Sequence, residues 1–405
     1  MRGVFMIRGI WMWPNNIYAR GTQKVVSILS KAGFTDIYFL TKGLSGKTSF
    51  HGQFAPHAFD RDLLMELLDC AHHHGIRVHA WFTSASDEHY KSLFPESGRA
   101  HFKRGKDKGL ISFKDKAYLA YLKDIVDEVV FNYPIDGVHL DYIRYNHMLY
   151  GWDEKDLSAY QAYGADQAEL FAFIEKTFFS EDADKDTCIF ESFKNGNKTL
   201  NAFFDSRKAD VIHFAKVILN GLRKQKPGLV LSAAVMPEGA YQDHSFADLH
   251  YGQVYDELSP LFDYLVPMAY SKAYDQNSAW IQKIGTNLYN KNTPHVMGVQ
   301  AYDHASGLIT QGDISVAKSI PNKGYALFRE GECAIVYRDH DLLLFNDTPY
   351  TITEIEIISD SSTHIMPVSV LPDEVVFLNA SSVPRHIMAR SGQEDVCVYF
   401  DPDCV

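Results

Sequence analysis

The segment Ile135–Tyr145, IDGVHLDYIRY, holds the strongest local concentration of side chains that could do chemistry. Its period-two alternation places His139 and Asp141 on one face of a strand and apolar residues on the other. Asp141 ends that strand, and Arg144 and Tyr145 follow it closely. An aspartate after a buried strand often serves only as a helix cap or a loop ion pair, but these polar neighbours favour a functional carboxylate.

Aromatic and polar side chains also gather at the ends of other predicted strands. Rings offer flat apolar faces and amide or charged groups read polar substituents, which is the usual composition of a ligand cleft. The aromatic candidates are Trp11, Trp13, Tyr38, Trp81, Tyr145, Tyr270 and Tyr302. The polar candidates beside them are Lys42, His139, Arg144, Lys272, Gln300 and Asp303.

Eight short β-branched and aromatic runs supply the strands that would position these residues. They begin near Gly3, Asp36, Arg77, Gly137, Val230, Tyr264, His295 and Gly324, with amphipathic stretches between them. Most offsets are close to the ~30 residues of a βα unit. The rhythm predicts an α/β fold, a closed (β/α)8 TIM barrel over residues 1–331. An open doubly wound sheet is the alternative, although no GxGxxG follows the first strand.

Helix boundaries fit this alternation. Predicted helices over Thr22–Lys31 and Asp60–His74 are each followed by a glycine suited to a left-handed C-terminal cap. A later helix, DVIHFAKVILNGLRKQ, has Asp205 or Ser206 as its predicted N-terminal cap.

Three further segments depart from the regular repeat. Long offsets predict insertions over 83–112, after the third strand, and over 146–205, after the fourth. Both would lie on the C-terminal face of the barrel, where they would wall a cleft. Short alternating runs such as TITEIEIIS then predict a small β-rich, sandwich-like domain over 332–405, either an accessory domain or a glycan-binding module.

Composition narrows the function classes. The chain has 405 residues, 46% of them hydrophobic and 22% charged, with a formal net charge of −12. That charge disfavours nucleic acid as a partner. No apolar stretch approaches the ~18 residues of a membrane span, and no leader peptide is recognisable, as expected for a cytoplasmic protein or a secreted one whose leader has been removed. Of the five cysteines, only Cys397 and Cys404 invite a disulfide bridge.

Three motifs give the chain a resemblance to a known group. DGVHLDYIRY, LSAAVMPE at the fifth strand and FDYLVPMAY at the sixth resemble the glycosyl-hydrolase-like TIM-barrel families of bacteria and archaea, over most of residues 1–330. More distantly, the chain is similar to microbial exopolysaccharide hydrolases, including polygalactosaminidases, which share a barrel with an aspartate ending strand four. The resemblance implies a carbohydrate substrate and hydrolysis of a glycosidic bond, with no metal or cofactor in the catalytic step. Such families usually place a tryptophan or a second acid after that strand, whereas Tyr142 follows Asp141 here.

Hydrolysis of a glycosidic bond needs two carboxyl groups, one protonated to assist the leaving oxygen and one ionised as nucleophile or base. We expect Asp141 to be the ionised group, held so by Arg144 or His139, and Glu238 after the fifth strand to be the general acid. That role requires burial or nearby negative charge to raise the pKa of Glu238. Other candidates for the second carboxyl group are Asp303, which ranks next, Asp275 and Glu330.

Two other functions remain open at this point. The same barrel could be a non-catalytic glycan-binding or cell-envelope protein, and a second carboxyl group across from Asp141 would discriminate between the two. A metal-dependent deacetylase or amidohydrolase would need a ligand set to which His79, His139 and Asp141 could contribute, but no HxH follows the first strand. We therefore predict no metal site.

Overall fold

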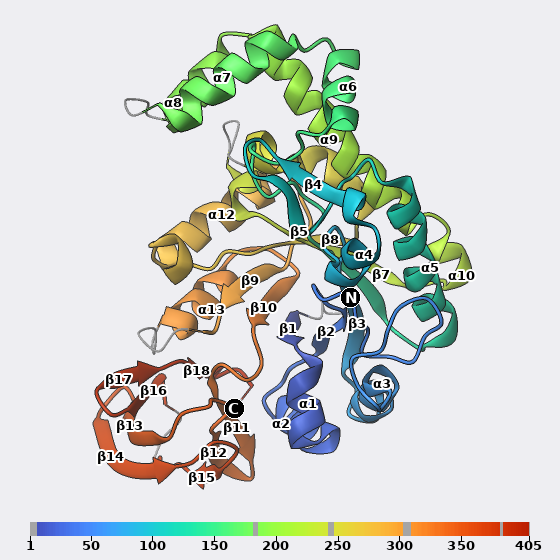
Figure 1. Cartoon of the computed structure of the whole chain (residues 1–405). Helices are drawn as coiled ribbons and strands as arrows, with labels where there is room; N and C mark the ends of the chain where they lie inside the picture. The colour runs from blue at the N-terminus through green and yellow to red at the C-terminus, as the bar shows by residue number, and fades with distance from the viewer. Residues whose placement is uncertain (1–5, 181–184, 242–246, 303–308, 381–383, 405) are drawn as a thin grey trace.

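Eight parallel strands form the centre of the structure, a computed structural model that describes residues 6–180, 185–241, 247–302, 309–380 and 384–404 (Figure 1). The strands are β1 (Ile7–Met12), β2 (Asp36–Lys42), β3 (Arg77–Thr83), β6 (Gly137–Asp141), β7 (Val230–Val235), β8 (Tyr264–Pro267), β9 (Met297–Gln300) and β10 (Gly324–Phe328). Their order is β8-β7-β6-β3-β2-β1-β10-β9, and bridges from Leu265 to His295 and from Met268 to Gly298 join the two ends. The predicted (β/α)8 barrel is confirmed, and each of the eight predicted runs overlaps one of these strands.

The barrel interior is filled by large side chains that pair their polar atoms with one another. Trp11, Tyr38, Trp81 and Tyr264 belong to one buried cluster inside the barrel. The Tyr38 and Tyr264 hydroxyls lie 3.0 Å apart, within hydrogen-bonding distance. Pairing of this kind removes the cost of burying polar groups, so the barrel is a packed core with its open site above the strand ends.

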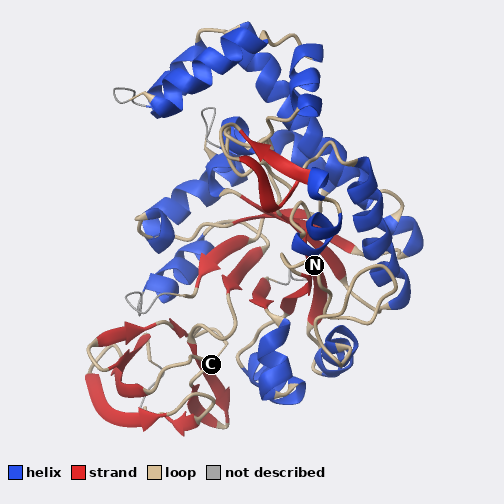
Figure 2. Cartoon of the chain, viewed as in Figure 1, coloured by secondary structure: helices blue, strands red, loops and turns tan. Residues whose placement is uncertain are grey.

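Helices surround the barrel, as Figure 2 shows. They are α1 (Pro14–Arg20), α2 (Thr22–Lys31), α3 (Leu63–His73), α5 (Lys116–Asn132), α11 (Tyr255–Leu258), α12 (Ser278–Asn290) and α13 (Ile309–Ser319). The predicted helix over Thr22–Lys31 is confirmed. The helix predicted from Asp60 begins at Leu63 instead, because the Asp62 side chain caps it by accepting a hydrogen bond from the Met65 N–H at 3.0 Å.

The long connections after β3 and β6 fold into elements of their own. After β3 come α4 (Glu88–Leu93), a 3-10 turn (Pro95–Ser97) and the hairpin β4 (Gly98–His101) and β5 (Gly105–Ile111). After β6 come α6 (Glu154–Ala162), α7 (Gln167–Phe179), α8 (Lys185–Lys194), α9 (Lys198–Leu219) and α10 (Leu222–Gln225). The predicted cap at Asp205 or Ser206 is wrong: α9 begins seven residues before Asp205, and Asn197 caps it.

Two antiparallel-rich sheets follow the barrel. The first contains β15 (Val375–Phe377), β12 (Asp341–Phe345), β11 (Ala334–Asp339) and β18 (Val398–Tyr399), in that order. The second contains β14 (Thr363–Val370), β13 (Ile352–Ile358), β16 (His386–Ser391) and β17 (Glu394–Val396). Both sheets contribute apolar side chains to one shared core. The predicted β-rich, sandwich-like C-terminal part is confirmed, and it lies beside α1, α2 and β10 (Figure 1).

Ion pairs join this sandwich to the barrel. Arg20 at the end of α1 forms ion pairs with Glu330, Asp347 and Asp373. The disulfide suggested for Cys397 and Cys404 is not formed, since both thiols are free. None of the helices within the described ranges is long and apolar enough to cross a membrane.

Candidate functional site

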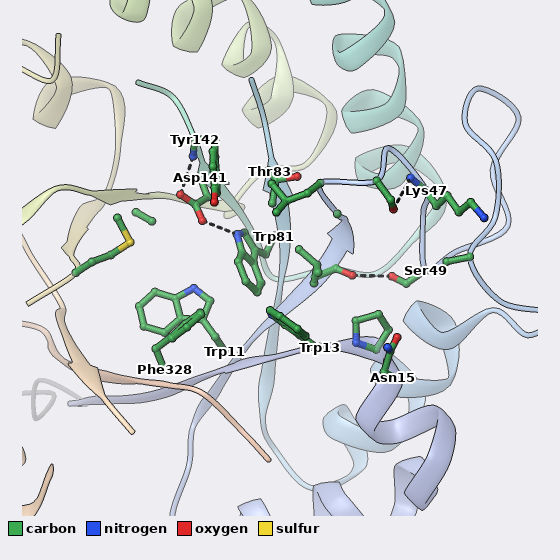
Figure 3. A pocket seen from close by; sticks show the side chains of 18 of the residues that line it. Trp11, Trp13, Asn15, Lys47, Ser49, Trp81, Thr83, Asp141, Tyr142 and Phe328 are labelled. Atoms are coloured by element: carbon green, nitrogen blue, oxygen red, sulfur yellow. Dashed lines mark hydrogen bonds between the residues drawn. The ribbon is translucent and has the colours of Figure 1, made fainter. Parts of the chain in front are cut away.

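A cavity of about 460 Å³ opens above the C-terminal ends of the barrel strands. Its floor and walls are strongly aromatic, and Figure 3 shows the rings of Trp11, Trp13, Trp81 and Phe328 gathered in it. Phe59, Tyr142 and Tyr270 complete the set of aromatic residues. The charged residues among its lining are Lys47, Asp141 and Arg144. This combination of flat rings and few charges suits a ligand with both apolar faces and polar substituents.

Asp141 ends β6 and presents its carboxyl group to the cavity with only 6% of the residue exposed. Its Oδ2 accepts a hydrogen bond from Trp81 Nε1 at 3.3 Å, and the Trp81 indole points toward it in Figure 3. Its Oδ1 accepts from the Tyr142 backbone N–H at 2.6 Å and from Arg144 Nη1 at 3.0 Å. The carboxyl group is thus held from both sides in one orientation.

The backbone just after β6 makes this arrangement possible. Tyr142 has φ 56°, in the left-handed region that a non-glycine residue rarely adopts. The chain therefore turns sharply after Asp141 and brings Arg144 back beside it. The Arg144 guanidinium also lies 4.4 Å from the centre of the Tyr142 ring, a cation–π contact. Of the two partners predicted to hold Asp141, Arg144 makes the ion pair, and His139 is engaged elsewhere.

Glu238 lies in the 3-10 turn Pro237–Ala240 that follows β7, and 9% of it is exposed. The Tyr274 hydroxyl lies 3.2 and 3.3 Å from its two carboxyl oxygens. Burial raises the pKa of Glu238, while the Tyr274 hydrogen bond and the positive charge of Arg144 oppose that effect. Glu238 is not among the residues that line the 460 Å³ cavity. Arg144 does line the cavity, and its positive charge pairs with Asp141 and lowers the pKa of Glu238.

The structure brings together in this cavity six of the residues expected to form a site. They are Trp11, Trp13, Trp81, Asp141, Arg144 and Tyr270. The Tyr302 ring lies 6.1 Å from those of Tyr270 and Phe328, at the edge of the same group. Gln300 is buried and bridges two loops, accepting from the Ala273 N–H and donating to the Tyr302 carbonyl, each at 3.0 Å. Asp303 lies outside the described residues.

Four other predicted binding residues are buried away from the cavity, which corrects their expected exposure. His139 lies inside the barrel, where its Nε2 accepts from Trp11 Nε1 at 3.2 Å and its Nδ1 is 2.9 Å from Ser232 Oγ. Burial lowers the pKa of His139 well below its ordinary value, so it is neutral. Tyr38 also lies in that interior, paired with Tyr264. Alternation along a strand predicts on which face a side chain lies, but it does not predict how deeply that side chain is buried inside the barrel.

Lys42 and Tyr145 are the other two. The Lys42 ammonium is completely buried and forms an ion pair with Asp87 Oδ2 at 3.0 Å. The Tyr145 hydroxyl donates to Asp210 Oδ2 at 2.8 Å, and the residue is 1% exposed. Lys42 thus holds the connection after β3 in place, and Tyr145 ties the loop after β6 to α9.

Asp275 and Glu330, also proposed as a second carboxyl group, are not among the residues that line the cavity. Asp275 is exposed at the end of a 3-10 turn that follows β8. Glu330 is buried and bound by Arg20. Among the residues with a described placement, no three His, Cys, Asp or Glu side chains are grouped as metal ligands. His79, suggested for a metal site, pairs with Asp36 at 2.8 Å in the barrel interior.

One wall of the cavity was not anticipated from the sequence. The segment 43–59 after β2 contributes Leu44, Lys47, Ser49 and Phe59 to the lining. The offset of 41 residues between the second and third predicted strands signals this long connection, since it exceeds a regular βα unit. Phe328 was missed as well, although it ends β10 and stacks on Tyr270 with ring centres 5.4 Å apart.

The chain was compared with known proteins by fold and by family. No curated protein matches the chain. Among solved structures, the PgaB (BpsB) glycoside hydrolase domain from Bordetella bronchiseptica superposes with a TM-score of 0.63 at 12% identity, covering 80% of this chain and 94% of that one. The catalytic domain of β-amylase from Paenibacillus polymyxa gives 0.57 at 10% identity, covering 80% and 92%. A β-galactosidase from Bacillus circulans sp. alkalophilus gives 0.56 at 13%, covering 80% and 50%.

At such low identity these likenesses establish the barrel fold alone. The family comparison reaches further, because the profile of the family described as glycosyl hydrolase-like 10 matches residues 7–306, which include every residue that lines the cavity except Phe328. The expected kinship with glycosyl-hydrolase-like TIM barrels is thereby confirmed. This chain belongs to the glycosyl hydrolase-like 10 family.

Proposed function

We propose that the protein hydrolyses glycosidic bonds of an oligosaccharide or polysaccharide bound in the 460 Å³ cavity. The observation that carries this proposal is the Asp141 carboxyl group, fixed by Trp81 and Arg144 at the end of a barrel strand and facing a cavity lined with aromatic rings. Catalytic groups of barrel enzymes lie at this face. The volume falls within the ~300–1,000 Å³ of typical small-ligand sites.

In this proposal Asp141 is the nucleophile or the base. Its oxygens accept three hydrogen bonds, from Trp81, the Tyr142 backbone and Arg144, which orient the carboxylate in its ionised form. A lone pair remains for a sugar carbon or a water molecule. The rings of Trp11, Trp13 and Tyr270 would stack on the C–H faces of sugar residues beside it.

Glu238 is proposed as the general acid. Its raised pKa keeps a proton available at higher pH than an exposed glutamate could, which is what protonation of a leaving oxygen requires. The Tyr274 hydroxyl orients the carboxyl group and moderates the rise in its pKa. Because Glu238 lies outside the cavity lining, this assignment requires the substrate to extend past Arg144 toward the loop after β7.

That placement also supports a second candidate function, glycan binding without hydrolysis. Of the residues described, Asp141 is the only carboxyl group in the cavity lining, and it is already paired with Arg144. A binding protein needs the aromatic rings and the charged pair but no second acid across the bond.

The experiment that separates these functions measures release of reducing ends from neutral, amino-sugar and uronate polysaccharides. Wild type is compared with Asp141→Asn and Glu238→Gln, each of which replaces a carboxyl group by an amide of equal size. Asp275→Asn is the matched control, since Asp275 is an exposed aspartate in the connection after β8 and does not line the cavity. Hydrolysis predicts release by wild type and the control and loss of release in both test variants.

Each alternative has its own outcome. Full activity of Glu238→Gln would remove Glu238 from the mechanism while leaving Asp141 in it. Binding of a glycan measured by calorimetry, with no release by any folded variant, would favour the non-catalytic function. Full activity of Asp141→Asn would refute the proposed site.

A further inference from the structure

The segment 142–152, here called the β6 loop, carries Arg144 between β6 and α6 outside any named helix or strand. Backbone pairing fixes it only at separate points: a β-bridge joins Tyr150 to His101, and the Tyr145 N–H donates to the Tyr251 carbonyl at 2.9 Å. Yet Arg144 reaches Asp141 only because this loop turns back after Tyr142. Its shape must come from contacts with the rest of the barrel.

Arg99, on β4 of the connection after β3, supplies one such contact. Its Nη1 donates to the carbonyl oxygen of Arg144 and to Asn146 Oδ1, both at 3.0 Å. Its Nη2 donates to the Ile111 carbonyl at 2.9 Å. The same guanidinium lies 5.0 Å from the centre of the Tyr145 ring. Arg99 thus binds the backbone of the very residue whose side chain pairs with Asp141.

Arg207, on α9 of the connection after β6, supplies a second contact. Its Nη1 donates to the Tyr150 carbonyl at 2.6 Å, and its Nη2 donates to the carbonyls of His147 at 3.0 Å and His250 at 2.8 Å. Its guanidinium lies 3.6 Å from the centre of the Tyr145 ring. Two long connections, absent from a minimal barrel, therefore each send one arginine to the β6 loop.

Burial of both guanidinium groups carries a large desolvation cost. Arg99 is 1% exposed and Arg207 is 0% exposed. Within the described ranges neither one forms an ion pair with a carboxylate. Burial lowers the pKa of Arg99 to about 10, which still leaves it charged at neutral pH. A buried charge without a counter-ion is rare unless many hydrogen bonds offset its desolvation, and here four of the six acceptor oxygens belong to the β6 loop.

We propose that Arg99 and Arg207 are positioning residues that hold the β6 loop so that Arg144 reaches Asp141. Their planar forks bind several carbonyl oxygens at once, and the Tyr145 ring between Arg144 and Asn146 in sequence receives both groups. A lysine at either position would keep the charge but could not reproduce the fork. The role of these two arginines in turnover rests on the proposed function, whereas their effect on the Arg144–Asp141 pair does not.

The structural effect is tested by the indole N–H resonance of Trp81, which reports its hydrogen bond to Asp141. The chain has five tryptophans, so Trp81→Phe assigns the signal in a nitrogen–proton correlation spectrum. Arg99→Lys and Arg207→Lys are each expected to move it toward its position in Asp141→Asn. Arg390→Lys is the control, since that arginine binds Glu354 and Asp395 in the C-terminal sandwich.

An unmoved Trp81 signal in a folded Arg99→Lys or Arg207→Lys protein would overturn the proposal for that arginine. Folding is checked by circular dichroism and by the remaining indole signals. The two arginines are tested separately, and Asn146→Ala, which removes one acceptor of Arg99, provides a milder perturbation in the same direction. None of these results requires a known substrate.

Once a hydrolysed glycan is found, a double-mutant cycle tests the path through Arg144. We expect Arg99→Lys to lower kcat about 10-fold while KM stays within about 3-fold, and to cause no further loss in an Arg144→Gln protein. Equal losses in both backgrounds would show that Arg99 acts on general stability instead. If wild type hydrolyses nothing, the proposed function fails while the Trp81 signal still decides the positioning role.

Discussion

The buried pair of Lys42 and Asp87 makes a strong prediction about stability. The Lys42 ammonium lies 3.0 Å from Asp87 Oδ2 and donates to the Ser86 carbonyl at 2.9 Å. Asp87 Oδ1 accepts from the Tyr90 N–H at 2.7 Å and so caps α4. Both charged side chains are fully buried. Lys42→Met keeps the length of the side chain but leaves Asp87 Oδ2 without its cation.

The size of the effect follows from that burial. Removing one partner of a buried ion pair typically costs ~3–5 kcal/mol, because the other charge stays in the interior uncompensated. For a chain of 405 residues, an unfolding entropy of roughly 2 cal/mol/K per residue converts this to a fall in Tm of about 4–6 °C.

The assay is calorimetric melting of wild type, Lys42→Met, Asp87→Asn and the double variant. In Lys42→Met/Asp87→Asn the amide still caps α4 and no charge is buried, so most of the lost stability should return. A fall in Tm below about 1 °C for Lys42→Met would refute this reasoning. A rise in KM at unchanged Tm would instead favour the substrate contact expected for Lys42 from its place at a strand end.

Three further outcomes follow from the site and its surroundings. Trp81→Phe removes the donor to Asp141 and keeps an aromatic ring, so kcat/KM should fall about 10-fold, and an unchanged initial rate at low substrate would contradict the role of that hydrogen bond. Tyr274→Phe removes a hydrogen bond that lowers the pKa of Glu238, so the alkaline limb of the pH–rate profile should move to higher pH; movement to lower pH would exclude Glu238 as the acid. Burial and the negative charge of Asp347 raise the pKa of Glu330 to about 8 against the opposing charge of Arg20, so its contribution to stability is present at acidic pH and is lost as pH rises through the raised pKa, and Glu330→Gln should flatten the fall of Tm between about pH 5 and about pH 8.

The sequence by itself determined the architecture. The eight strands of the barrel overlap the eight predicted runs because buried parallel strands need continuous β-branched and aromatic residues, a pattern that survives in any tertiary context. Alternation in GVHLD likewise set Asp141 at the end of β6 on the interior face. The C-terminal sandwich followed from its short alternating runs for the same local reason.

Sequence spacing was less informative about depth and partners. His139 and Asp141 lie on the same face of β6, yet His139 is buried in the barrel interior against Trp11, whereas Asp141 lines the cavity. Lys42 ends its strand as Asp141 does, but α4 brings Asp87 over it. Position along a barrel strand fixes direction, whereas exposure depends on which loop folds across the strand end.

Only the tertiary structure decided how the site is assembled. Trp81 and Arg144 both reach Asp141, one from a neighbouring strand and one from a loop that turns back through a left-handed residue. Arg99 and Arg207 come from two long connections whose path across the barrel the sequence does not predict, and all but one of their acceptors are backbone carbonyls, which every residue carries. Contacts of that kind are invisible in residue types, because they depend on where distant segments meet and not on what the segments are.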